Sequence, residues 1–236
     1  MGRMQFKDLV LWESEDYIAI NKPPFIASLD DRNDEASILS LARGYHEEAQ
    51  LCHRLDKETS GVLIIAKHPE AYRHLSLQFE DRKVEKTYYA VVDGIHDFKN
   101  TKCERPIYKL SNGTVKIDAR GKRAVTYITT MKAFKQHSLV SCQPVTGRMH
   151  QIRIHLSSLQ APITGDLTYG GRPFYLSSVK RKYNLKKGTE EQPLIKRLAL
   201  HARHIKFKGL KEEVIEQVAP EPKDFKVLVK QLDKNS

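Results

Sequence analysis

The segment from Gly61 to Ala66, with the sequence GVLIIA, is the feature that most constrains how this chain can fold. It is short and almost wholly apolar, and it lacks the polar–apolar alternation of a strand that faces water on one side. Such a run is typical of a strand that is covered on both faces inside a sheet. We therefore expect a buried central strand at this position.

Strands and helices interleave around this segment without a strict strand–helix alternation. Helices are expected over 38–45, with Asp34 as the N-terminal cap, from Pro69 onward, over 146–159 and over 222–232. Strands are expected over 9–12, 17–20, 86–92, 103–110, 115–119, 124–134, 139–144 and 198–206, and Asn112-Gly113 predicts a hairpin. The fold class is therefore α+β, with a mixed, largely antiparallel central sheet flanked by helices and loops. We expect residues 1–236 to form one domain, with two subdomains that share the sheet.

The chain is strongly basic. Its 40 Lys and Arg residues outnumber 29 Asp and Glu residues, which gives a formal net charge of +11 and a sequence pI near 9.5. A charge of this sign attracts polyanions, so nucleic acid is the first partner to consider. An ordinary basic surface remains the alternative at this point.

The cysteines and histidines argue against disulfides and metal. Three widely spaced cysteines form no C-x-x-C pair, which indicates neither a disulfide framework nor a zinc site and favours a reducing cytoplasm. His150 and His155 are five residues apart with no nearby acid to complete a ligand set, so we expect no metal. No apolar run approaches the ~20 residues that span a bilayer, so we expect no membrane anchor and no targeting signal.

Asp56 is a candidate reacting group, because it precedes the buried strand by a few turn-forming residues. Reactive groups are often held on such loops by a rigid scaffold. A solvated loop aspartate is the commoner explanation on local features alone, and a turn salt-bridged by Arg54 and Lys57 is another.

Two further segments carry candidate groups. In the strand around KTYYAVV, Tyr88 and Tyr89 point to opposite faces, so one can reach a site while the other packs. On a helix over 146–159, Met149, Ile152 and Leu156 form an apolar stripe with Arg153 at its edge. Arg153 is then either a boundary residue with a buried stem, the commoner case, or the buried partner of a carboxylate.

Taken together, these segments resemble the RluA-type family of RNA pseudouridine synthases. HRLDKETSGVLIIAK is similar to the family's catalytic-aspartate motif, KTYYAVVDG to its Lys-x-Tyr motif, and TGRMHQIRIHLSSLQAPITGDLTYG to its third motif. Asn21-Lys22-Pro23 and LALHARHIKF match as well, so the resemblance runs from about Leu9 to Phe207. We expect a compact member without an N-terminal S4 domain, since none fits before Leu9.

The chain departs from the family pattern at two positions. Pro24-Phe25 stands where the family usually has a glycine soon after Lys-Pro, and Met149 stands where a small or hydroxylated residue is commoner. Both departures leave the shape of the substrate groove open.

The resemblance implies a role for each matching residue. Asp56 would be the nucleophile, Tyr88 the tyrosine that stacks on the base, Arg153 the partner of the Asp56 carboxylate, and Arg54 the residue that fills the gap left by an extruded uridine. Further substrate contacts are expected from His53, Thr59, Lys86, Arg148 and His150. A phosphate-contacting patch is expected from Lys180, Arg181, Lys182, Lys186 and Lys187, with a solvated basic loop as the alternative.

The implied activity is isomerisation of uridine to pseudouridine in RNA by a cytoplasmic, monomeric enzyme that needs no cofactor. Ribosomal RNA is the first expected substrate and transfer RNA the second. Covalent attack by Asp56 and assistance in removing a 2′ proton both remain open. A non-catalytic RNA-binding module of the same fold is the main alternative. A glycosidase or nuclease is weaker, because the segments offer no well-spaced second carboxylate and no metal-ligand cluster.

Overall fold

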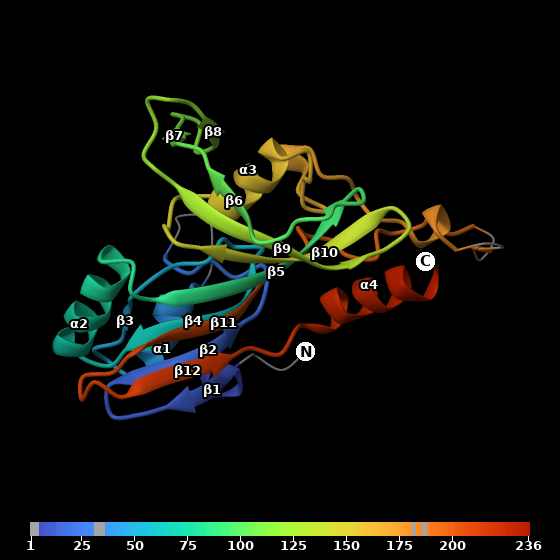
Figure 1. The fold of residues 1–236 in the computed structure, drawn as a ribbon. Helices are drawn as coiled ribbons and strands as arrows, with labels where there is room; N and C mark the ends of the chain where they lie inside the picture. Colours follow the sequence, from blue (N-terminus) through green and yellow to red (C-terminus); the bar gives the residue numbers. More distant parts are fainter. Residues whose placement is uncertain (1–4, 31–35, 181–182, 186–187) are drawn as a thin grey trace. The chain divides into compact units, whose positions relative to one another are not determined.

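The computed structural model describes residues 5–30, 36–180, 183–185 and 188–236. They fall into two compact units. Unit 1 comprises Met1–Tyr88 and His201–Glu221, and unit 2 comprises Tyr89–Leu200 and Pro222–Ser236. Strand β5 (Glu85–Asp93) carries the chain from the first unit into the second (Figure 1). The expectation of one domain with a shared sheet stays a prediction.

Unit 1 is built on a mixed sheet. Strands β1, β2, β4, β11 and β12 follow one another in this order, and β3 also pairs with β4. Strands β4 and β11 run parallel, whereas β1–β2, β2–β4 and β11–β12 are antiparallel. The bounds of its elements are η1 (Phe6–Leu9), β1 (Val10–Glu13), β2 (Tyr17–Lys22), α1 (Ile38–Tyr45), β3 (Gln50–Leu51), β4 (Ser60–Ala66), α2 (Pro69–Glu80), β11 (Leu200–Lys208) and β12 (Val214–Val218).

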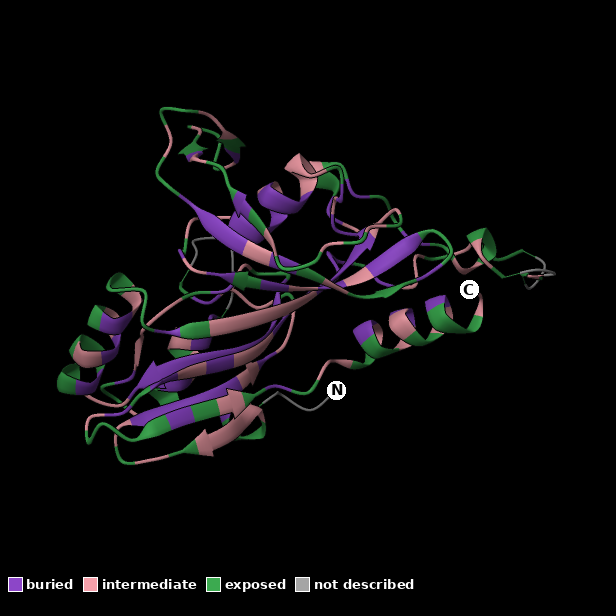
Figure 2. Ribbon diagram, viewed as in Figure 1, coloured by how far each residue is buried: buried purple, intermediate pink, exposed green. Residues whose placement is uncertain are grey.

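The core of unit 1 forms around β4, and the prediction of a fully buried strand is confirmed. All seven residues of β4 are buried, as its continuous colour in Figure 2 shows. Ile38 and Ala42 from α1 and Ala71 and Leu75 from α2 join the same hydrophobic cluster. An unbroken apolar strand can be covered on both faces only when further elements pack on the sheet, and α1 and α2 contribute to that cover.

Unit 2 has an antiparallel sheet in which β9 pairs with both β10 and β6, and β7 and β8 form a separate hairpin. Gln151 ties α3 to β9, because its amide donates to Val125 O (2.9 Å) and Thr126 Oγ1 (3.0 Å). The bounds of its elements are β6 (Thr101–Glu104), β7 (Ile107–Lys109), β8 (Val115–Ile117), β9 (Val125–Ala133), β10 (His137–Pro144), α3 (Gln151–Ser158), η2 (Leu167–Tyr169), η3 (Leu176–Ser178) and α4 (Lys223–Lys234).

The α+β class and the largely antiparallel strand pairing are confirmed, and so is the hairpin at Asn112-Gly113, where Gly113 has φ 81°. Three details were wrong. The helix expected over 146–159 begins only at Gln151, because Gln151 Oε1 accepts from Thr146 Oγ1 and from Arg148 N and holds that segment as a turn. The strand expected over 103–110 is divided into β6 and β7, and Pro106 between them has no N–H to donate to a ladder. Helix α1 is capped by Ser37, whose Oγ accepts from Ser40 N, and Asp34 lies outside the described residues.

Glycine is required where β4 meets β11. Gly61 has φ 121°, and a Cβ at this position would lie 2.2 Å from Ala202 O. We predict that Gly61→Ala lowers the free energy of unfolding by at least about 1–3 kcal/mol, because the two strands must move apart. Urea unfolding followed by circular dichroism measures the change.

Gly44→Ala is the matched control. Gly44 lies in α1, has an exposed backbone and has nothing within 4 Å of an added Cβ. This change should raise the free energy of unfolding by about 0.5–1 kcal/mol, since alanine restricts the unfolded chain more than glycine does. Equal effects of the two substitutions would show that the close approach at Gly61 is not what requires glycine.

Candidate active site

The loop that carries Asp56 is held by main-chain and buried side-chain contacts on either side of the carboxylate. Ser28 Oγ donates to Leu55 O (2.7 Å) and accepts from Leu55 N (3.0 Å). On the other side, Lys57 O accepts from Phe25 N (2.8 Å) and from the Lys22 ammonium (3.1 Å). These bonds fix the backbone immediately before and after Asp56, which is itself half-buried.

Lys22 is the unusual member of this arrangement, because its side chain is fully buried. Its ammonium donates to Pro23 O (2.9 Å) as well as to Lys57 O. A buried ammonium is costly unless it is hydrogen-bonded, so these bonds strongly favour one path of the two loops that meet there. The Asn21-Lys22-Pro23 motif therefore acts as a clamp on the Asp56 loop.

Asp56 and Tyr88 are brought together in unit 1. Burial raises the pKa of the Tyr88 phenol, and the negative charge of Asp56 raises it further. The phenol is therefore protonated at neutral pH, so that it can donate a hydrogen bond or stack on a base, but it is a poor base itself. This proximity is what the predicted roles of nucleophile and stacking tyrosine require, and those roles stay predictions.

The other predicted residues of unit 1 have different surroundings. His53 Nε2 accepts from Ile64 N (3.1 Å), and burial, with a smaller contribution from Lys86, lowers the pKa of His53 to about 3. His53 is thus a neutral side chain that ties the loop to β4. Burial lowers the pKa of Lys86 to about 8, and its ammonium lies 5.4 Å from the centre of the Phe79 ring. Arg54 is exposed.

Among the predicted substrate-contacting residues of unit 1, Thr59 has a buried side-chain hydroxyl without a hydrogen-bond partner in the described part of the chain. Its side chain is buried, and its Oγ1 has no hydrogen-bond partner among the described residues. A buried hydroxyl without a partner costs free energy, which makes it a candidate to bind a polar group of the substrate.

Arg153 lies on α3 in unit 2 and is buried, with 7% of its surface exposed. Its Nε donates to Asp166 Oδ2 (2.6 Å) and its Nη2 to Asp166 Oδ1 (2.8 Å), a bidentate pair. The commoner interpretation from sequence, a boundary residue on an apolar stripe, was wrong, because the guanidinium of Arg153 is itself buried and bonds to Asp166. The buried partner of a carboxylate is what the structure contains, and the pairing of Arg153 with Asp56 stays a prediction.

The segment around Asp166 also positions two aromatic groups. The Arg153 guanidinium lies 5.0 Å from the centre of the Tyr169 ring, and the Tyr169 hydroxyl lies 2.8 Å from His150 Nδ1. His155 is engaged elsewhere, with Thr126 Oγ1 at 2.9 Å and Arg105 O at 3.1 Å. Both histidines therefore have protein partners. Within the described ranges, no group of three or more His, Cys, Asp or Glu side chains could hold a metal ion.

Arg148 lies in the turn before α3, where its Nε donates to Arg123 O (3.2 Å). Of the predicted phosphate-contacting patch, Lys180 is described, with its ammonium 5.9 Å from the centre of the Tyr183 ring. Arg181, Lys182, Lys186 and Lys187 lie outside the described residues. The role of the patch stays a prediction.

Two residues, Lys22 in unit 1 and Asp166 in unit 2, were not predicted from the sequence as site residues. Asp166 lies inside the third motif, in Gly165-Asp166, and an acid in a glycine-rich turn was the available signal. Lys22 lies in the short motif Asn21-Lys22-Pro23, but nothing local marks that lysine as buried. Among the described helices, none is long and apolar enough to cross a membrane.

Comparisons with known proteins show the family of the chain. The model of the RNA pseudouridylate synthase family matches residues 16–158, which is more than half of the chain. The chain belongs to this family. An uncharacterized RNA pseudouridine synthase of Helicobacter pylori (strain J99) is 36% identical over 225 residues, covering 94% of this chain and 78% of the relative. Ribosomal large subunit pseudouridine synthase C of Buchnera aphidicola is 34% identical, covering 86% of this chain.

The chain spans 63% of the length of the Buchnera protein and 62% of its Vibrio vulnificus counterpart, which is 33% identical. Among solved structures, human RNA pseudouridylate synthase domain containing 4 matches with a TM-score of 0.72 and 26% identity, covering 97% of this chain and 95% of that one. The structure of human RNA pseudouridylate synthase domain containing 1 matches with a TM-score of 0.70 and 25% identity, covering 94% and 87%.

The Arg153–Asp166 pair yields a stability prediction. Asp166→Ala removes both acceptors of the bidentate pair from the buried guanidinium of Arg153, so it should lower the free energy of unfolding by about 3–5 kcal/mol. Urea unfolding of the wild-type and variant proteins measures this change in the free energy of unfolding. Asp97→Ala is the control, because the Asp97–Lys99 pair is exposed by 74% and 82% and should contribute little.

A second variant separates charge from packing. The double substitution Arg153→Leu with Asp166→Leu should be more stable than Asp166→Ala alone, because no buried charge is left unpaired. Additive losses in the double variant would contradict a direct interaction between the two side chains.

Proposed function

We propose that this chain is an RNA pseudouridine synthase, an isomerase that converts uridine to pseudouridine within an RNA strand. The observation that carries the proposal is that Lys22 and Ser28 clamp the loop of Asp56, and that Asp56 lies near enough to the Tyr88 phenol for its charge to raise the pKa of Tyr88. Membership of the family supplies the reaction class, and the net charge of +11 suits a polyanionic substrate.

The reaction breaks the N1–C1′ bond of uridine, rotates the base and joins C5 to C1′. N1 gains a proton and C5 loses one, so no electrons are gained or lost overall. Asp56 would act either as a nucleophile or in removal of a 2′ proton, and both roles need an ionised carboxylate at a fixed position. Tyr88 would stack on the base, and Arg153 would pair with the Asp56 carboxylate.

A uridine stacked in RNA must be extruded before Asp56 can reach it. An arginine wedge and an aromatic platform are the expected parts for this step. Arg54, which is exposed on the Asp56 loop, would fill the space that the base leaves. The buried Thr59 hydroxyl would then bind a polar group of the nucleotide.

Large-subunit ribosomal RNA is the proposed substrate, because the relatives from Buchnera and Vibrio carry names that specify it. Transfer RNA is the second choice. The motifs build a catalytic centre and carry no information about which RNA is recognised.

Asp56→Asn tests the proposal. Total RNA from cells that lack this chain is incubated with the purified protein, and pseudouridine is mapped at nucleotide resolution. Wild-type protein should add pseudouridine at defined sites, and Asp56→Asn should reduce the yield by at least 1,000-fold, on the order expected for loss of a nucleophile. RNA binding should persist in the variant.

Glu58→Gln is the matched control, because it removes one negative charge from an exposed residue two positions away. It should leave the yield close to that of wild type. An Asp56→Asn protein that makes as much product as wild type would refute the assignment. Release of free uracil or cleavage of the strand would instead indicate a glycosidase or a nuclease, and bound RNA without product would indicate a binding module.

A further inference from the structure

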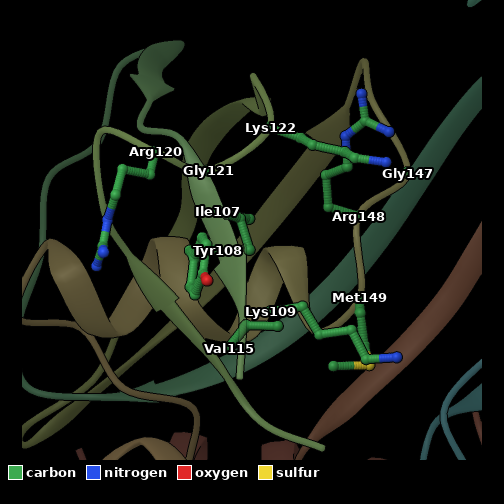
Figure 3. Close-up of a pocket in the computed structure, with 10 residues that line it drawn as sticks. All are labelled: Ile107, Tyr108, Lys109, Val115, Arg120, Gly121, Lys122, Gly147, Arg148 and Met149. Carbon is green, nitrogen blue, oxygen red and sulfur yellow. The ribbon is translucent and has the colours of Figure 1, made fainter. Parts of the chain in front are cut away.

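A basic pocket lies within unit 2, between the β7–β8 hairpin, the turn that precedes β9 and the turn that precedes α3 (Figure 3). Its volume is about 410 Å³. The ten residues that line it include four cations and no acid. They are Ile107, Tyr108, Lys109, Val115, Arg120, Gly121, Lys122, Gly147, Arg148 and Met149.

The positive charge of the pocket is only partly neutralised. Arg120 forms a bidentate pair with Asp118, at 2.7 and 3.0 Å. Arg148 donates to a main-chain carbonyl, which leaves its charge intact. No ion pair of Lys109 or Lys122 occurs within the part of the chain that the structure describes. Three net positive charges therefore face one small volume.

Main-chain hydrogen bonds hold two of the segments that line the pocket together. Ile107 and Lys122 exchange two main-chain hydrogen bonds, each 2.9 Å long. Gly121 makes this approach possible, since a Cβ there would lie 2.4 Å from the Ile107 carbonyl carbon. The backbone of Lys122, which lies in the turn before β9, is thus held against β7.

The base of the pocket is apolar. Ile107 and Val115 are buried, and Met149 packs against the cluster that they form. Tyr108 adds an aromatic ring at the surface, with 36% of the residue exposed. Figure 3 shows the Lys122 and Arg148 side chains extending toward the same end of the pocket in this view, with Tyr108 between them and Arg120.

We propose that this pocket binds one nucleotide of the RNA strand other than the uridine that reacts, with its phosphate on the cations and its base on the apolar floor. Phosphate contacts provide affinity, and stacking on an aromatic ring or apolar surface accommodates any base. The proposal rests on the proposed function, since it assumes an RNA substrate. It gives Arg148 its predicted substrate contact and adds Lys109 and Lys122.

The test compares two variants with equal charge changes. One carries Lys109→Gln, Lys122→Gln and Arg148→Gln. The control carries Lys83→Gln, Lys99→Gln and Lys211→Gln, which alter exposed lysines paired with Asp81, Asp97 and Glu15 outside the pocket. Binding of unmodified RNA is measured against salt concentration, and circular dichroism verifies that each variant is folded.

The pocket variant should reduce the slope of log affinity against log salt by about 2, since each lost phosphate contact contributes about 0.7 for a single strand. The control should change the slope much less. Equal slopes in the two variants would overturn the proposal, because general charge would then explain both. Charge reversal by Lys122→Glu alone is the second variant, and unchanged RNA affinity with it would also overturn the proposal.

Free uridine monophosphate serves as the competing probe. If the wild-type protein binds uridine monophosphate and the pocket variant does not, while both proteins bind RNA equally well, the pocket is a site for a free nucleotide and the RNA proposal fails. Because binding is measured without turnover, failure here is distinct from failure of the proposed function, in which wild-type protein binds RNA but makes no pseudouridine.

A second, independent observation concerns Phe25 in unit 1. Its backbone has φ 69°, in the left-handed region that bulky residues rarely adopt, and 52% of the residue is exposed. Its N–H holds Lys57 O beside Asp56. The family usually has a glycine near this position, and glycine would adopt this backbone without strain.

We infer that the Phe25 ring contacts a base of the RNA next to the reacting uridine and helps to determine which uridine is chosen. The positive φ of Phe25 costs free energy, and its exposed ring gains no stability from burial. Because Phe25 bonds to Lys57, the residue after Asp56, a contact with RNA near the reacting uridine would explain why this residue is present. Stacking of a base on the ring would be worth about 5-fold to 100-fold in affinity.

Phe25→Gly should therefore have opposite effects on stability and on substrate recognition. The Tm should rise by about 2–4 °C because the backbone strain is relieved, whereas KM for RNA should rise by about 5-fold or more with kcat nearly unchanged. Phe25→Trp should keep KM near that of wild type. A Phe25→Gly protein with an unchanged KM would overturn the inference, and so would one with a lowered Tm, since the residue would then be structural.

Discussion

The clamp of Lys22 on the Asp56 loop is the interaction on which the rest of the site depends. Its ammonium is fully buried and bonds to the carbonyls of Pro23 and Lys57, so the loops at the ends of β2 and ahead of β4 must meet in one arrangement. On the other side of Asp56, Ser28 holds Leu55 with a reciprocal pair of bonds. Because β4 is buried along its whole length, the loop leads into a strand that is packed in the core, and Asp56 lies near enough to Tyr88 for its charge to raise the pKa of the phenol.

A second buried charge organises unit 2. Asp166 holds the guanidinium of Arg153 in a bidentate pair, and the same turn places Tyr169 against both Arg153 and His150. A buried ion pair is expensive to form and costly to break, so its use here is better explained by the orientation of Arg153 than by stability. Each unit thus contains a charged side chain with a position that is set by buried hydrogen bonds.

The sequence predicts the main strands, helices and turns well, because these elements follow from patterns of neighbouring residues. The apolar run Gly61–Ala66, the hairpin glycine at 113 and the proline that opens α2 each have one dominant physical explanation. The site is different. Asp56 viewed alone resembles a solvated loop residue, and only its occurrence with Tyr88 and Arg153 in three ordered motifs makes it a candidate nucleophile.

The remaining features depend on contacts between residues that are distant in the chain. The start of α3 at Gln151 is set by bonds from the Gln151 side chain to Thr146, Arg148 and β9. Arg153 pairs with Asp166 across a turn whose path no local pattern predicts, and the buried Lys22 ammonium donates to the carbonyl of Lys57, which is 35 residues away in the chain. The left-handed backbone of Phe25 likewise occurs together with a hydrogen bond to Lys57, and the sequence around Phe25 predicts neither feature.

If Asp56 drives exchange of the C1′–N1 bond for a C1′–C5 bond, loss of the C5 hydrogen reports that exchange directly. RNA labelled with tritium at C5 of uridine is incubated with the wild-type protein and with Asp56→Asn, and tritium released to water is counted. We expect release by the wild type in step with pseudouridine formation, and none above background from the variant. Tritium release that is equal in both proteins, or pseudouridine formation without tritium release, would contradict the account.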